Sequence, residues 1–130
     1  KQAVALIAGA CVNASAVASY LCSHSEGPVY LLCAGTRGAF SIEDFYCAGL
    51  IAAQLEHTYG FDDFAWAAVG LTQVPITDVV NTRTCRHLNF LLESGFKTDI
   101  EVALSQDVTD VVPLYDNTLH LFTVAADNKG

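Results

Sequence analysis

The chain is short of positive charge, contains no methionine and has no long apolar run. Six of its 130 residues are Lys or Arg, against 14 Asp or Glu, and the formal net charge is −8. Nucleic acids and anionic membranes both attract basic surfaces, so this composition argues against either as a partner. No apolar run approaches about 18 residues, and no transmembrane helix is predicted. Because no initiator methionine is present, we expect a fragment, the C-terminal part of a longer protein.

Signatures of several common active sites are missing as well. The sequence contains neither Gly-x-x-x-x-Gly-Lys-Ser/Thr nor Gly-x-Gly-x-x-Gly, so a nucleotide-binding domain has no motif support. A serine hydrolase would lack its Gly-x-Ser-x-Gly signature. The five cysteines are odd in number and form no Cys-x-x-Cys pair, which predicts reduced thiols in a cytoplasmic protein.

What is present is a dense apolar sequence, 52% hydrophobic and 15% charged, enough for one domain over residues 1–130. Apolar runs at Val4–Ala10 and Val29–Ala34 predict two strands, with a helix from Asn13 to about Cys22 between them. A strand, a helix and a strand within about thirty residues form a βαβ unit. The pattern therefore predicts an α/β fold, with parallel strands covered on both faces.

The rest of the chain predicts mainly helices. A long helix follows Ser41, and its small inner residues allow close packing against the sheet. Further helices are predicted after Asp62, over Thr77–Gly95 and from Thr98. Two short terminal strands are expected at Val111–Pro113 and Leu119–Phe122.

The second junction, Gly35–Asp44, is where the second predicted strand passes into a helix. Its loop, Gly35-Thr36-Arg37-Gly38, contains the only Lys or Arg between Lys1 and Arg83. Glycines let a backbone turn sharply and expose N–H groups, and a guanidinium fork matches phosphate or sulfonate oxygens. In open α/β sheets ligands bind at this edge, so the loop predicts an anion site; pairing of Arg37 with a surface carboxylate is the alternative.

Two carboxylates follow on the first turn of the helix. Ser41 and Asp44 fit a capping box, and Glu43 and Asp44 suit a helix N-terminus without any function. The same two carboxylates could instead hold Mg²⁺ and so neutralise a phosphoryl group. The sequence leaves both readings open.

The first junction, Asn13–Ser15, repeats this geometry one strand earlier. Asn13 fits an N-cap, and with Ser15 it could also face the same polar crevice. His87 is a further candidate, whereas the neighbouring Cys85 thiol would point about 200° away from it on a helix, at 100° per residue.

An ordered set of motifs resembles the 2-phosphosulfolactate phosphatase (ComB-like) family. The matching segments are 13–18, 33–44, 47–49, 95–100 and 110–113. The resemblance implies a three-layer α/β/α sandwich with a mostly parallel or mixed sheet, of which the N-terminal half is absent here. It also implies an Mg²⁺-dependent phosphatase that converts 2-phosphosulfolactate to sulfolactate and phosphate, a step of coenzyme M synthesis.

The leading hypothesis assigns three sets of residues. Substrate binding falls to Asn13, Ser15, Gly35, Thr36, Arg37, Gly38 and Ser41. Metal binding falls to Glu43 and Asp44, and catalysis to Glu43, Asp44 and His87. The alternative is a non-catalytic anion-binding or assembly module. We expect a small anionic substrate and either a homo-oligomer or association with the absent N-terminal half.

Overall fold

A computed structural model describes residues 3–81 and 85–125 as a mixture of helices and one small sheet, compatible with the α/β class. The elements in chain order are the 3₁₀ turn η1 (Cys11–Asn13), α1 (Ala14–His24), α2 (Ile42–Ala53), α3 (Asp63–Leu71), α4 (Ile76–Asn81), α5 (Arg86–Glu93), α6 (Lys97–Ala103), β1 (Pro113–Asp116) and β2 (Leu121–Val124). No helix of the described residues combines the length and apolar character needed to cross a lipid bilayer.

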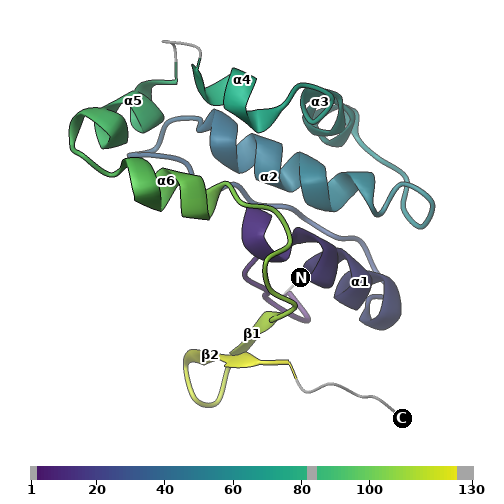
Figure 1. The fold of residues 1–130 in the computed structure, drawn as a ribbon. Coiled ribbons are helices and arrows are strands. Elements are labelled where there is room, and N and C mark those ends of the chain that lie inside the picture. Colours follow the sequence, from purple (N-terminus) through teal and green to yellow (C-terminus); the bar gives the residue numbers. More distant parts are fainter. Residues whose placement is uncertain (1–2, 82–84, 126–130) are drawn as a thin grey trace.

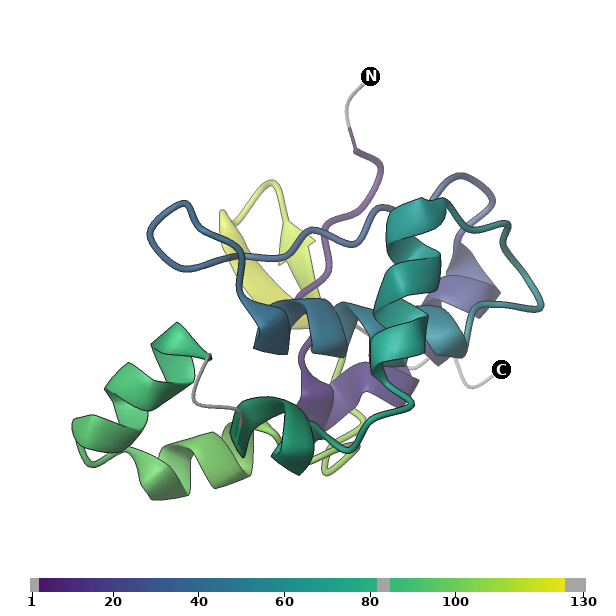
Figure 2. The ribbon, with the colours of Figure 1, turned by 90° about the horizontal axis from the view of Figure 1, so that it is seen from above.

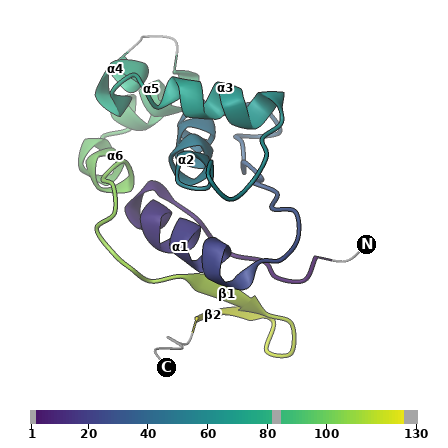
Figure 3. The same cartoon turned by 90° about the vertical axis from the view of Figure 1, so that its right-hand side faces the viewer.

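The elements stack in the order α3, α2, α1 and then the β1–β2 hairpin (Figures 1 and 3). The main core lies between α1, α2 and the segment before β1, and its buried members are Ala14, Val17, Ala18, Ile51, Leu55 and Val112. Gly49 sets the close approach of α2 to α3, since a methyl group there would overlap the Ala68 carbonyl. The small residues of α2 therefore serve packing against a helix, where the sequence predicted packing against a sheet.

A second cluster holds α5 and α6 together beside the start of α2. Cys85, Leu88 and Ile100 are its buried members, and Ile42 packs against them. The prediction of one continuous helix over Thr77–Gly95 is wrong, because α4 and α5 are separate helices. Cys85 precedes α5 in a non-helical conformation, and its thiol donates to the Val79 carbonyl oxygen at 3.0 Å. Gly95 ends α5 at a φ of +86°, as predicted.

The two N-terminal strands predicted from the apolar runs do not form as regular strands among the described residues. Val4–Ala10 is extended and makes a single antiparallel bridge, Ile7 with Leu114. Val29–Ala34 is extended without any ladder partner. The predicted βαβ unit and its parallel pairing are therefore wrong for this structure. An apolar run favours extended backbone, but a strand also needs a neighbour to pair with.

The two terminal strands do form, slightly later in the chain than predicted. β1 and β2 pair antiparallel, with Pro113 opposite Val124 and Asp116 opposite Leu121. Tyr115 and Phe122 face each other across the hairpin with their rings in an edge-to-face contact. β1 also carries the bridge to Ile7, so it joins the two ends of the described chain.

Candidate functional site

The second junction folds as a tight hairpin turn. The Thr36 amide donates to the Ala39 carbonyl and the Ala39 amide to the Thr36 carbonyl, both at 2.9 Å. Arg37 and Gly38 occupy the tip with φ of +52° and +76°. Positive φ at both central positions defines a type I′ turn. Figure 2 shows the blue loop before α2 projecting at the edge of the molecule.

Side chains of the helix that follows fix this turn in place. The Asp44 carboxylate accepts a hydrogen bond from the Gly35 amide at 2.7 Å, and the Thr36 and Ser41 hydroxyls lie 2.8 Å apart. The predicted capping box is therefore wrong. The Ser41 side chain makes no capping bond to α2, and the Asp44 carboxylate is directed to the loop. A carboxylate in the first helical turn can accept from amides of the helix N-terminus or from amides of a nearby loop. Here the loop folds back close enough for the Gly35 amide to donate to Asp44.

Arg37 is exposed at the tip of the turn, and no ion pair joins it to a residue that the structure describes. Its own amide and that of Gly38 also make no hydrogen bond within residues 3–81 and 85–125. The tip thus presents a guanidinium and two N–H groups to an incoming group. Glu43 and Asp44 are half-buried behind it at the start of α2.

The carboxylates offer only part of a metal shell. Over the described residues, no group of three or more His, Cys, Asp or Glu side chains is arranged to hold a metal ion. Glu43 and Asp44 are consecutive on α2. His87 is half-buried on α5, the helix whose cluster touches Ile42, the residue before Glu43. The fold therefore brings the element carrying His87 against the start of α2.

Asn13, in the first junction, has its side chain committed to backbone groups. It is 5% exposed. Its amide donates to the carbonyls of Ala8 at 3.3 Å and Val111 at 3.0 Å, and its oxygen accepts from the Ala10 amide at 2.8 Å. Asn13 stands at the N-cap position of α1 without making the capping bond predicted for it. Instead it ties the N-terminal segment to the segment before β1.

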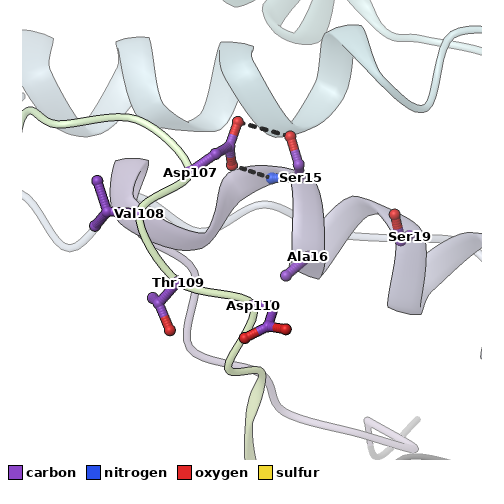
Figure 4. A pocket seen from close by; sticks show the side chains of 7 residues that line it. All are labelled: Ser15, Ala16, Ser19, Asp107, Val108, Thr109 and Asp110. Atoms are coloured by element: carbon purple, nitrogen blue, oxygen red, sulfur yellow. Dashed lines mark hydrogen bonds between the residues drawn. The ribbon is translucent and has the colours of Figure 1, made fainter.

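The first turn of α1 is capped by a residue from the far end of the chain. The Asp107 carboxylate accepts from the Ser15 amide and from the Ser15 hydroxyl, each at 2.7 Å (Figure 4). Asp107 holds a φ of +50°, which directs its side chain back to the helix. Sequence reasoning missed Asp107, since no local pattern links it to Ser15. The only indications in the sequence were its residue type, since Asp tolerates positive φ, and its position between two predicted elements.

This contact forms one wall of an open pocket of about 450 Å³. Ser15, Ala16 and Ser19 of α1 line it on one side, and Asp107 to Asp110 on the other. Figure 4 shows the Asp110 carboxylate below Ala16, apart from the Asp107–Ser15 contact. A second pocket of about 330 Å³ lies between the Pro28–Cys33 segment, α2 and α3 and has a largely apolar lining. Arg37, Glu43, Asp44 and His87 line neither pocket.

All five cysteines are free thiols, and three of them are electrostatically linked to Asp44. A hydrogen bond with the Cys11 thiol, together with burial, raises the pKa of Cys47. Partial burial, followed by the charge of Asp44, raises the pKa of Cys33. A raised pKa keeps a thiol protonated and a poor nucleophile at neutral pH. We therefore assign no nucleophilic role to Cys33 or Cys47.

Comparison with known proteins supplies the family. A family model described as 2-phosphosulpholactate phosphatase matches residues 1–118. A Thermotoga maritima protein named probable 2-phosphosulfolactate phosphatase is 37% identical over 117 residues, which cover 86% of this chain and 48% of the relative. Proteins of the same name from Caldanaerobacter subterraneus, 35% identical, and Thermotoga petrophila, 33% identical, cover the same 86% of this chain. The chain spans about half the length of these relatives.

Proposed function

Since this chain belongs to the 2-phosphosulfolactate phosphatase family, we propose that it forms part of an enzyme that hydrolyses 2-phosphosulfolactate, or a similar small phosphorylated acid. Sulfolactate and inorganic phosphate are the products. Water forms the new O–P bond, the ester O–P bond breaks, and the leaving alkoxide takes up a proton. The names of the relatives support the reaction, and the turn of the second junction supports its location.

The observation that carries the proposal is the turn tip. It combines an exposed guanidinium with two amides that make no bond to the described residues, on a loop held by the Asp44–Gly35 hydrogen bond. We assign Arg37 to one anionic group of the substrate, with the Arg37 and Gly38 amides beside it. A bidentate guanidinium contact fixes orientation as well as charge. Gly35, Thr36 and Ser41 hold the turn that presents these donors.

Two residues suit a magnesium ion. Mg²⁺ in phosphoryl-transfer sites is bound by one or two carboxylates, with waters and substrate oxygens completing its shell. Glu43 is the first candidate ligand, because no hydrogen bond ties its carboxylate to another described residue. Asp44 keeps one carboxylate oxygen beyond the one that Gly35 occupies. Bound there, Mg²⁺ would neutralise charge on the phosphoryl group.

His87 is the candidate for proton transfer to the leaving oxygen. An imidazole changes charge near neutral pH and is the most frequent general acid or base in enzymes. Packing of the α5–α6 cluster against Ile42 supports its place near Glu43. Asn13 and Ser15 have structural partners, so their part in substrate binding would be to position the neighbouring backbone.

The test is phosphate release from 2-phosphosulfolactate by the protein at the family's full length. We expect Arg37→Ala and Glu43→Ala each to lower kcat/KM by about 10²-fold, the usual effect of removing one transition-state contact. EDTA should abolish release and added Mg²⁺ should restore it. Lys97→Ala and Glu56→Ala are matched controls, since both residues are exposed and lie outside the second junction. Undiminished turnover in both Arg37→Ala and Glu43→Ala would remove the site assignment.

The other prediction from the sequence, an anion-binding or assembly module without catalysis, is not favoured by the names of the relatives. It would give phosphate or sulfonate binding that EDTA leaves unchanged and no phosphate release. For location we propose the cytoplasm, because five free thiols suit a reducing compartment.

A further inference from the structure

Residues 28–34 form neither a helix nor a turn, and no strand of the described residues pairs with them. Their side chains alternate, with Val29 and Leu31 packed against the main core. Tyr30 and Leu32, the alternate residues, are 79% and 87% exposed. No backbone hydrogen bond connects residues 28–34 to the rest of the described chain. Figure 2 shows this blue segment as a plain coil along one side of the molecule.

The N-terminal segment, Val4–Ala10, pairs with β1 along one edge, and no strand of the described residues lies along its other edge. The Ala8 amide donates to the Pro113 carbonyl at 3.0 Å, and the Tyr115 amide to the Leu6 carbonyl at 2.9 Å. In an antiparallel pair of this kind, the N–H and C=O of the residue between, Ile7, face away from β1. Val4 is fully exposed beside them. Both apolar runs therefore present peptide groups that a strand would satisfy.

Unpaired extended backbone flanked by exposed apolar side chains is a template for strand addition. Two features of this chain indicate what is added. The relatives extend over about twice the matched length, with the chain covering 48% of the Thermotoga maritima protein. Self-pairing is disfavoured, since each copy has a formal net charge of −8.

We propose that Pro28–Ala34 accepts a β-strand from the half of the family polypeptide that this chain does not match. The strand carries apolar residues at alternate positions, which cover Tyr30 and Leu32, while its backbone pairs with residues 29–33. It closes the outer side of the 330 Å³ pocket that Pro28–Cys33 borders. The proposal holds whether that half is a separate polypeptide or continuous with this one, and it depends on family membership alone, not on the reaction.

The experiment joins this chain to the unmatched half of the Thermotoga maritima relative and follows amide hydrogen exchange. In the joined protein we expect alternate amides within residues 29–33, those directed to the added strand, to exchange at least about 100-fold more slowly than in the chain alone. Leu32→Lys should reduce that protection. Leu119→Lys is the control, because Leu119 is also exposed, at 59%, and lies in the β1–β2 turn.

A second protein keeps the test decisive if the joined chain does not fold. The complete Thermotoga maritima relative should protect the amides that align with 29–33, and its matched half alone should not. Equal, fast exchange in both would overturn the proposal. So would protection already present in this chain alone together with a dimeric mass by light scattering, which would assign the edge to a second copy. None of these readouts requires phosphatase activity.

Discussion

The junction before α1 and the junction before α2 use their polar side chains in different ways. In the first junction, Asn13 and Ser15 each bond to a residue far along the chain, Val111 at a separation of 98 residues and Asp107 at a separation of 92. In the second, the bonds are local, between residues 35 and 44, and they leave the Arg37 guanidinium at an exposed tip. Long-range bonds build the fold, whereas short-range bonds hold a loop that presents a charge. We therefore place recognition chemistry in the second junction.

The largest expected effect is at Asn13. Asn13→Ala removes three hydrogen bonds and leaves the Ala8 and Val111 carbonyls and the Ala10 amide without their partner. We expect a loss of about 2–4 kcal/mol in the free energy of unfolding, measured by urea denaturation. Gln54→Ala is the matched control, since this exposed amide bonds only to its own helix, and it should change stability by less than about 0.5 kcal/mol. A loss below about 1 kcal/mol in the free energy of unfolding of Asn13→Ala would contradict the structural role.

Asp107 comes next, because it caps α1 from a backbone with positive φ. Asp107→Ala loses the cap and also strains the backbone, so we expect a loss of about 1–2 kcal/mol. Asp107→Gly loses the cap but suits a φ of +50°, and should be less destabilising than alanine. Thermal unfolding of both variants beside Asp110→Ala, a control in the same pocket, tests this order. If glycine were as harmful as alanine, the backbone conformation assigned to Asp107 would be wrong.

At the second junction the expected effects on stability are smaller. Asp44→Ala removes the acceptor for the Gly35 amide, and we expect a loss of about 1 kcal/mol. Glu43→Ala is its neighbour on the same helical turn and loses only the favourable interaction with the helix dipole, about 0.3 kcal/mol. Urea denaturation of the pair measures the difference. Equal losses would show that the Asp44–Gly35 hydrogen bond does not hold the turn.

The smallest effect is expected at Arg37. Glycine suits a φ of +52° at least as well as arginine does, so Arg37→Gly should keep the free energy of unfolding within about 0.5 kcal/mol. Combined with a drop in phosphate release, this result would separate a binding role from a structural one. A loss above that margin would mean that the guanidinium stabilises the fold, and the contrast between the two junctions would fail.

The sequence was most informative where the determining contacts are local. α1 starts after Asn13 and α2 after Ser41, as their patterns predict, and Gly95 follows the end of a helix, as predicted. The family resemblance was also confirmed by the match over residues 1–118. The helix starts and the helix end depend on residues within a few positions of one another. Reading along the chain is enough to find them.

Two of the failures involve a partner that lies far away in the chain or is absent from the pattern. Val29–Ala34 was predicted as a buried parallel strand, but the run of apolar residues does not specify what lies beside it, and Leu32 is 87% exposed. Asn13 was assigned a local cap, although its side chain bonds to the carbonyl of Val111, 98 residues later. The roles given to Arg37, Glu43, Asp44 and His87, the magnesium ion and the three-layer sheet stay predictions, which the experiments above address.

The carboxylate that completes the start of α1 has a consequence for how the chain is made. Asp107 follows Ser15 by 92 residues, so during translation the first helix leaves the ribosome long before its cap exists. At synthesis rates of about 5–20 residues per second, that delay is roughly 5–20 seconds. For this interval the Ser15 amide and hydroxyl lack the carboxylate to which they donate in the finished fold.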